Sequence, residues 1–315
     1  MIHANLIHLS YNLWEDQTPA DDNDPALPER VHDRAYHPAL QFDEGLWRRL
    51  VARMAQAGMN RVVLDLGDGV AWQSRPEIAV EGAWPTEKLR GELTRCRDAG
   101  LEPIPKLNFS ATHDVWLGEY ARKVSTKEYY AVCRDLIAEA VELFDGPRLF
   151  HLGMDEETAR HQRYHQYVVI RQGGLWWSDL NFLVEQVQRR GSTAWVWSDI
   201  LWGMDAGDFE RNMPKSVVQS NWYYGEDFDP QDATQRRYVE AFVELDRMGY
   251  RQIPTGSNWS NEQNYPLLVD HCRRHVDASR VLGYLMTSWK PTLPSEEARH
   301  VRAIEIAAAA HGRAE

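Results

Sequence analysis

Apolar segments of strand length alternate along this chain with segments of helical periodicity, and this alternation restricts the folds open to it. The expected strands are residues 5–11, 60–66, 102–109, 148–154, 193–199, 216–222, 250–257 and 281–288. The expected helices are residues 42–58, 86–99, 125–144, 175–190, 206–213, 230–248, 260–275 and 294–311. Strands and helices in strict alternation are typical of parallel sheets covered by helices.

The helices are indicated by their periodicity and by their ends. Leu46, Leu50 and Met54 recur on one face of the first expected helix. Ser125 and Glu128 have the spacing of a capping box at the start of the third.

The order of elements predicts an α/β chain with a single (β/α)8 barrel over residues 1–315. No linker, internal repeat or low-complexity segment divides the sequence. A doubly wound open sheet is the alternative, but the first strand is not followed by the Gly-rich fingerprint of nucleotide-binding folds.

The charge and the cysteines exclude several classes of partner and location. A formal net charge of −12 argues against nucleic acid and anionic membranes as partners. No stretch approaches the roughly 18 apolar residues of a spanning helix, and the N-terminal residues do not resemble a signal peptide. The 3 cysteines are widely spaced, which indicates reduced thiols. We therefore expect a soluble, cytoplasmic protein, and the sequence leaves its oligomeric state open.

Tryptophan is unusually abundant, with 13 residues in the chain. Several tryptophans follow apolar segments instead of lying within helical stripes. Flat aromatic rings stack on the C–H faces of sugars, so this abundance favours a carbohydrate site, although core packing is the ordinary role of any one tryptophan.

In a (β/α)8 barrel the active site lies at the C-terminal ends of the strands. Polar and aromatic residues cluster at these expected ends, where a ligand would bind: Asn12, Trp14, Asp68, Trp72, Asn108, His113, Asp155, Glu156, Trp197, Asp199, Trp222, Tyr223, Asn258, Trp259 and Trp289.

Three consecutive carboxylates, Asp155, Glu156 and Glu157, follow the fourth expected strand. A charged helix start would explain them through the helix dipole. A catalytic carboxylate pair at the end of a barrel strand would explain them equally well, and Glu157 would then be a solvated neighbour.

The segment from His151 to Glu156 resembles the H-x-G-G-D-E signature of family 20 glycoside hydrolases, the β-N-acetylhexosaminidases. Residues 66–84 are similar to that family's second-strand segment, and residues 104–113 to its third-strand segment. Trp197, Trp222 and Trp289 fall where the family places the tryptophan walls of its sugar pocket.

The resemblance implies a retaining, substrate-assisted hydrolysis of amino-sugar glycosides, without cofactor or metal. The substrate's 2-acetamido oxygen would attack the anomeric carbon and form an oxazolinium intermediate. Asp155 would then hold the acetamide N–H, and Glu156 would protonate the leaving oxygen. An ionised Asp155 would favour the protonated form of Glu156. Asp68 and His113 match positions that support the general acid.

The sequence also departs from the family pattern. Met154 replaces the second Gly of the signature, and Asn12 stands nearest to the missing first-strand Arg. The seventh-strand Tyr-x-Asp is missing, which leaves Tyr223, Tyr224 and Asn258 as candidate donors to the acetamide carbonyl. These losses leave N-acetylgalactosamine as plausible a sugar as N-acetylglucosamine.

Two other functions fit parts of the sequence. His161 and His165 stand four residues apart, a spacing that places two imidazoles on one helix face and could bind zinc in a metal-dependent hydrolase with Asp155. A sugar-binding barrel without turnover would explain the missing Arg and Tyr-x-Asp, but it would not need an adjacent Asp–Glu pair.

Overall fold

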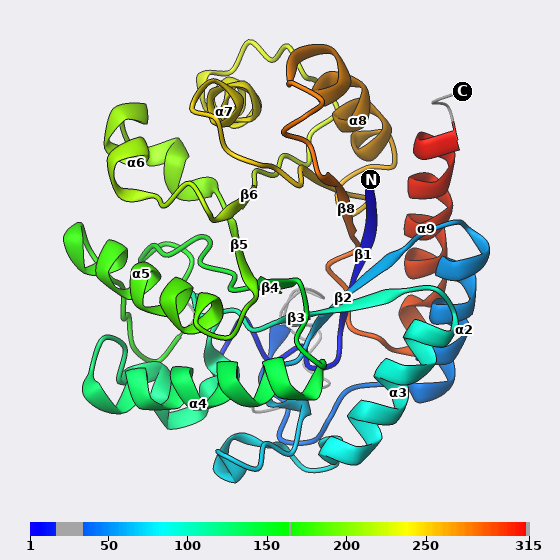
Figure 1. Ribbon diagram of the computed structural model, residues 1–315, viewed down its shortest axis with the longest axis vertical. Coiled ribbons are helices and arrows are strands. Elements are labelled where there is room, and N and C mark those ends of the chain that lie inside the picture. Colours follow the sequence, from blue (N-terminus) through cyan, green and yellow to red (C-terminus); the bar gives the residue numbers. More distant parts are fainter. Residues whose placement is uncertain (17–33, 164, 313–315) are drawn as a thin grey trace, which may run out of the picture.

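The computed structural model describes residues 1–16, 34–163 and 165–312. Its centre is a sheet of eight parallel strands in the order β6-β5-β4-β3-β2-β1-β8-β7 (Figure 1). The strands are β1 (Ile2–His8), β2 (Arg61–Asp65), β3 (Glu102–Lys106), β4 (Leu149–His151), β5 (Thr193–Trp197), β6 (Val218–Ser220), β7 (Thr255–Ser257) and β8 (Gly283–Thr287).

The edge strands β6 and β7 meet through isolated parallel bridges between Gln219 and Gln252 and between Trp222 and Thr255. These bridges close the sheet into a barrel, so the predicted (β/α)8 fold is confirmed.

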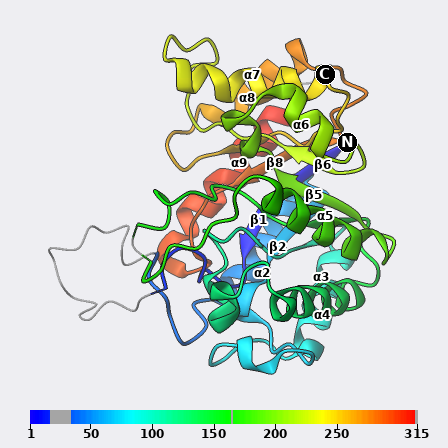
Figure 2. The ribbon, with the colours of Figure 1, turned by 90° about the vertical axis from the view of Figure 1, so that its left-hand side faces the viewer.

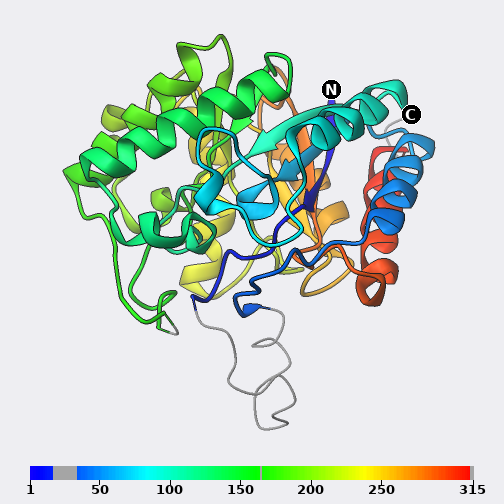
Figure 3. The same ribbon diagram turned by 90° about the horizontal axis from the view of Figure 1, so that it is seen from below.

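Helices surround the strands (Figure 1). They are α2 (Glu44–Gln56), α3 (Thr86–Asp98), α4 (Lys127–Leu143), α5 (Gly174–Gln188), α6 (Ala206–Asn212), α7 (Ala233–Arg247), α8 (Asn264–His275) and α9 (Glu297–Gly312). The neighbouring helices α4 and α5 pack side by side (Figure 2), and α9 lies against α2 at the start of the ring (Figure 3). Within the described residues, no helix has the length and apolar character needed to cross a bilayer.

The capping box expected from Ser125 and Glu128 does not form, because the N-cap of α4 lies one residue later. Thr126 is the N-cap, and its side chain accepts the Tyr129 N–H at 3.2 Å. Ser125 instead adopts a φ of 64° and donates its hydroxyl to Asp179 at 2.7 Å. Both residues are typical N-caps, so composition alone could not choose between them.

The barrel interior contains an apolar layer and a polar layer. The apolar layer includes Leu6, Val63 and Ile104, which are buried on β1, β2 and β3. Two residues further along these strands, the interior residues are His8, Asp65 and Lys106, in register with one another. The polar layer therefore lies at the C-terminal ends of these strands, next to the apolar layer.

Lys106 and Asp65 form a buried ion pair in this polar layer. Burial opposes ionisation of Asp65, but the Lys106 charge and the His8 hydrogen bond hold its pKa below the usual value. Burial, followed by the Lys106 charge, lowers the pKa of His151, the register neighbour of Lys106 on β4. At neutral pH the layer thus carries one ion pair beside a neutral His151.

Replacing Lys106 by Met is expected to lower the free energy of unfolding by about 3–5 kcal/mol, because the Asp65 carboxylate would remain buried without its partner. Urea unfolding measures this loss. The matched double variant Lys106→Met/Asp65→Leu removes both charges and should recover most of it. A loss below about 1 kcal/mol in the single variant would contradict this account of the pair.

Candidate active site

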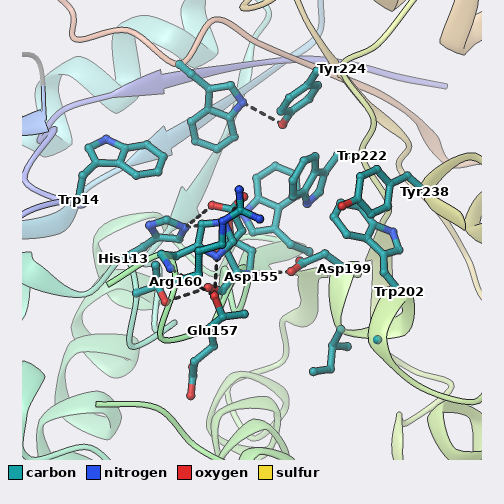
Figure 4. Close-up of a pocket in the computed structure, with 18 of the residues that line it drawn as sticks. Trp14, His113, Asp155, Glu157, Arg160, Asp199, Trp202, Trp222, Tyr224 and Tyr238 are labelled. Carbon is teal, nitrogen blue, oxygen red and sulfur yellow. Dashed lines mark hydrogen bonds and ion pairs between the residues drawn. The ribbon is translucent and has the colours of Figure 1, made fainter. Parts of the chain in front are cut away.

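A pocket of about 990 Å³ opens at the C-terminal ends of the strands. Asp155 and Glu156 line it, together with His113 and Asp199 (Figure 4). Its aromatic lining combines Trp14, Trp197, Trp202, Trp222, Tyr224, Tyr238, Trp259 and Trp289. Carboxylates at the end of β4 therefore face a cavity walled by flat rings.

The backbone after β4 turns sharply, and this turn separates the three consecutive carboxylates. Gly153, Met154 and Glu156 have φ angles of 71°, 75° and 53°. Residues other than glycine rarely adopt a positive φ, and such backbone strain concentrates at functional sites. Asp155 and Glu156 both line the pocket as a result, although neighbours on a regular strand would point to opposite faces.

Gly153 is required at this turn by a close approach as well as by its φ. A Cβ at this position would lie 1.9 Å from Oδ1 of Asn108. Asn108 cannot move without loss, because its Oδ1 accepts the Met154 N–H at 3.2 Å and its Nδ2 donates to Oδ1 of Asp155 at 2.8 Å. Met154 has a positive φ although bulky residues rarely adopt one, and its side chain is buried.

Asp155 is buried and surrounded by donors and positive charge. Its Oδ2 lies 3.4 Å from Nε2 of His113, and Ser110 donates its hydroxyl to the Asp155 carbonyl. Burial opposes ionisation, but His113, then Lys106 and the Asn108 amide, lower the pKa of Asp155 to about 2. Asp155 is therefore a carboxylate throughout the physiological range.

Glu156 is the more accessible of the pair, with 24% of its side chain exposed. Its Oε2 lies 3.3 Å from Nε2 of His113, and its Oε1 lies 3.4 Å from Nε2 of His161. Its strained backbone is held on both sides, since its N–H donates to Oδ2 of Asp199 at 2.8 Å and its carbonyl accepts the Thr112 hydroxyl at 2.9 Å.

Glu157 is not the solvated residue that the sequence suggested, because only 3% of its side chain is exposed. Arg171 binds it in a bidentate manner, with Nε to Oε1 at 2.9 Å and Nη2 to Oε2 at 2.8 Å. The backbone N–H of Ala111 also donates to Oε2, at 3.1 Å. The third carboxylate is thus neutralised by Arg171 and anchors the end of the turn.

The pKa values of His113 and Asp199 are both raised, which leaves His113 charged and Asp199 uncharged at neutral pH. Burial disfavours the charged form of His113, but the Asp155 and Glu156 carboxylates outweigh it and raise the pKa to about 10. Burial of the Asp199 carboxyl, then the charge of Asp155, raise its pKa to about 8. At neutral pH the site therefore combines an imidazolium, a carboxylate at Asp155 and a protonated Asp199.

The three predicted wall tryptophans, Trp197, Trp222 and Trp289, all line the pocket. Trp289 has a φ of 49° and donates its indole N–H to the Tyr224 hydroxyl at 2.8 Å (Figure 4). Tyr224 stacks on Trp222 with ring centroids 5.0 Å apart. Burial raises the pKa of Tyr224, which keeps its O–H proton available for donation.

Other predicted residues do not line the pocket. Asn12 donates to Oδ2 of Asp68 at 2.9 Å and to the carbonyl of His37 at 2.8 Å. Burial raises the pKa of Asp68 to about 7 despite its hydrogen bonds from Ser10 and Asn12. Asp68 and Asn12 therefore form a buried pair beside the site, whereas His113 contacts both carboxylates as expected.

Tyr223 and Asn258 also point elsewhere. The Tyr223 hydroxyl donates to Gln235 at 3.3 Å, and the Asn258 amide donates to the carbonyl of Arg299 at 3.0 Å. The adjacent residues Tyr224 and Trp259 face the pocket instead. The alternation of side-chain direction along an extended segment explains both one-residue differences.

The structure separates His161 from His165. Residues 158–163 form turns instead of a helix, so a spacing of four does not place both imidazoles on one face. His161 faces Glu156, whereas Nε2 of His165 contacts the Trp14 carbonyl at 2.5 Å.

Within the described part of the chain, one group has the spacing of metal ligands: His113, Asp155 and Glu156, with one ligand atom each within 4.8 Å of the others. With a pKa of about 10, His113 is protonated at neutral pH. An imidazolium has no lone pair for a metal, so an ion would have to displace this proton. The group is therefore an ion-pair cluster unless a metal competes successfully.

Several lining residues could not be chosen from sequence. Trp202 and Tyr238 pack against each other with ring centroids 3.9 Å apart; Trp202 comes from a 3-10 helix (Asp199–Gly203) that the sequence did not predict, and Tyr238 comes from α7, which looked like an ordinary amphipathic helix. Asp199, by contrast, was among the expected strand-end residues, because it follows Trp197 at the end of β5.

No protein-family model matches the sequence, and no curated protein matches it. Solved structures do resemble the fold. The β-N-acetylhexosaminidase of Bacteroides fragilis is 13% identical with a TM-score of 0.64, and the match covers 98% of this chain and 65% of that one. The family 20 β-N-acetylhexosaminidase of Streptomyces coelicolor is 13% identical with a TM-score of 0.62, covering 96% of this chain and 63% of that one.

Dispersin B is a third similar structure, with 14% identity and a TM-score of 0.58. That match covers 89% of this chain and 96% of dispersin B, whereas this chain spans less than two thirds of the two hexosaminidases. At these identities the likeness shows a shared barrel fold. The names of these proteins agree with the family that the His151–Glu156 segment resembles.

Asp199→Asn should stabilise the protein increasingly as pH rises. Folding raises the pKa of Asp199 from 3.8 to about 8, so the native state holds a proton that the unfolded chain releases. Wild-type stability from this group is complete below pH 3.8 and declines until about pH 8. The urea midpoint of Asp199→Asn should therefore exceed that of wild type by an amount that grows between pH 3.8 and about pH 8 and is constant above that pH.

Asp208→Asn, at an exposed position of α6, is the control and should show no such trend. A constant difference between Asp199→Asn and wild type at all pH values would contradict the protonated state of Asp199.

Proposed function

We propose that this chain is a glycoside hydrolase that removes terminal β-linked N-acetylhexosamine by a retaining, substrate-assisted mechanism. The supporting observation is the ionised Asp155 beside the accessible Glu156, at the floor of a pocket with aromatic walls. The barrel shared with proteins named β-N-acetylhexosaminidases agrees with this proposal.

In the proposed first step, the acetamide oxygen of the substrate attacks the anomeric carbon and the glycosidic bond breaks. Glu156 donates its proton to the leaving oxygen, and its partial exposure suits contact with an entering glycan. Asp155 accepts the acetamide N–H, and its negative charge stabilises the positive charge that develops on the oxazolinium ring.

Tyr224 is the donor that we assign to the acetamide carbonyl in place of the family's missing tyrosine. Its oxygen accepts the Trp289 N–H, and burial keeps the proton on the hydroxyl, so the O–H group can act as a donor to a ligand. Donation to the carbonyl orients the oxygen for attack on the anomeric carbon.

In the second step water attacks the oxazolinium ion, Glu156 takes the water proton, and the sugar leaves with retained configuration. His113 keeps a proton 3.3 Å from Oε2 of Glu156 and 3.4 Å from Oδ2 of Asp155. We assign His113 as a positioning residue that keeps its own proton throughout the cycle and whose positive charge offsets the repulsion between the two carboxyl groups.

The sugar itself is a finer part of the proposal. Asn12 and Asn258 bond elsewhere, so neither side chain is free to grip the 4-hydroxyl. A site without a buried partner for a hydroxyl discriminates little between its epimers. N-acetylgalactosamine and N-acetylglucosamine should therefore both fit.

The purified protein should hydrolyse aryl N-acetyl-β-hexosaminides without added metal, with retention. Glu156→Gln should reduce turnover of substrates with poor leaving groups by about 10²–10⁴-fold, because they need a proton from the general acid. Activated aryl substrates should lose less in the bond-breaking step. Steady-state and burst kinetics on matched leaving groups measure the difference.

If Glu156→Gln lowered the rate of bond breaking equally for substrates with poor and with activated leaving groups, Glu156 would not be the general acid. Activity that a chelator abolishes and zinc restores would favour a metal site at His113, Asp155 and Glu156. Sugar binding without any turnover would favour a non-catalytic barrel.

The enzyme should cleave β-GalNAc at least as well as β-GlcNAc, and it should leave the corresponding β-galactoside and β-glucoside intact because they lack the internal nucleophile. Asp155→Asn should slow both amino sugars alike. A kcat/KM for β-GlcNAc about tenfold above that for β-GalNAc would overturn the specificity. Cleavage of a glycoside without the acetamide would overturn the mechanism.

A further inference from the structure

The two oxygens of the Glu156 carboxyl group face two different histidines. Oε2 lies 3.3 Å from Nε2 of His113, whose side chain is only 2% exposed. Oε1 lies 3.4 Å from Nε2 of His161, whose side chain is 41% exposed. Oε1 is therefore on the solvent side of the carboxyl group, where the leaving part of a glycan would enter the pocket. His161 has no role in the steps proposed above.

The charge of His113 makes the two oxygens chemically different. The imidazolium stabilises negative charge on the nearby Oε2 of Glu156, so a proton on this carboxyl group is favoured on Oε1. Oε1 is then the oxygen that gives a proton to the leaving group and takes one back from water. His161 therefore contacts the reactive oxygen of Glu156.

Thr158 holds the ring of His161 in place. Its hydroxyl oxygen lies 2.8 Å from Nδ1 of the ring and accepts the backbone N–H of His161 at 3.3 Å. That N–H also lies 3.1 Å from the Thr158 carbonyl oxygen, and the Thr158 N–H donates to the Glu156 carbonyl at 2.7 Å. These turns bring His161 back against the side chain of the residue from which they start.

The Thr158 hydroxyl can support either neutral form of the His161 ring, because a hydroxyl both donates and accepts hydrogen bonds. With the ring proton on Nδ1, Nε2 can accept a hydrogen bond from a protonated Oε1. With the ring proton on Nε2, the ring faces an ionised Oε1 as a donor, and the hydroxyl donates to Nδ1. The pair thus suits both states of Glu156, as an acid and then as a base.

We propose that His161, oriented by Thr158, is a positioning residue that keeps Oε1 of Glu156 on the leaving-group side of the pocket in both steps. This inference rests on the proposed function. Glu156 is 24% exposed, so its side chain has room to turn away from the substrate when the support is lost. The loss should appear where proton transfer limits bond breaking.

A series of aryl N-acetyl-β-hexosaminides with leaving groups of graded acidity tests the proposal. Thr158→Val removes the hydroxyl and keeps the shape of the side chain, and it should lower kcat/KM about 10-fold for poor leaving groups and far less for activated ones. Thr158→Ser should recover most of this loss. His161→Phe keeps a ring without its nitrogens and should reproduce the loss. Thr94→Val, at an exposed position of α3, is the matched control and should behave as wild type.

A double variant separates positioning from a general loosening of the loop, which would slow every substrate. In the Glu156→Gln background no carboxyl group remains to be positioned, so Thr158→Val should have no further effect. Equal losses on all leaving groups, or losses that multiply with that of Glu156→Gln, would overturn the proposal.

Histidine NMR reports the contact whether or not a glycoside is cleaved. In protein containing isotopically labelled histidine, Glu156→Gln should shift the ring nitrogen signals of His161. Those of His165, which contacts the Trp14 carbonyl, should stay in place. Unchanged His161 signals would overturn the inference. Shifted signals in a protein that cleaves no N-acetylhexosaminide would support the His161–Glu156 pairing and count against the proposed function alone.

Discussion

The turn after β4 is the constraint on which the site depends. Three adjacent carboxylates repel one another, and a regular strand would send neighbours to opposite faces. Positive φ angles at Gly153, Met154 and Glu156 break that regularity. The cost of this backbone is offset by the hydrogen bond that the Met154 N–H donates to Asn108, by the one that Thr112 donates to the Glu156 carbonyl, and by the bidentate ion pair of Glu157 with Arg171. Each carboxylate thereby acquires its own surroundings.

The surroundings of each carboxyl group then determine whether it is ionised or protonated. Lys106 in the barrel interior and His113 at the pocket floor keep Asp155 ionised, while burial and the Asp155 charge keep Asp199 protonated. A protonated Asp199 can accept the Glu156 N–H without adding a further negative charge to the site. The polar layer within the barrel is thus connected to the chemistry proposed above it, because its one cation contributes to the charge state of Asp155.

The sequence was sufficient for the barrel, since hydrophobic periodicity located the eight strands and the α-helices of the described residues with only their ends displaced, although it missed short 3-10 helices such as Val115–Arg122. It also located Asp155, Glu156, His113 and the three wall tryptophans, because strand ends determine the site in this fold. It could not choose Tyr224 over Tyr223, because that choice depends on side-chain direction beyond a strand. It could not foresee that Arg171 would pair with Glu157, because that contact depends on how the irregular loop between β4 and α5 folds back on itself.

The central claim is that Asp155 acts on the substrate's own acetamide during bond breaking. A stable thiazoline analogue of the oxazolinium intermediate, titrated calorimetrically against wild type and Asp155→Asn, tests it most directly. Wild type should bind the analogue at least about 10²-fold more tightly than N-acetylglucosamine, as expected for a mimic of a high-energy species. Asp155→Asn should lose that advantage. An analogue that binds wild type no more tightly than the plain sugar would contradict the mechanism.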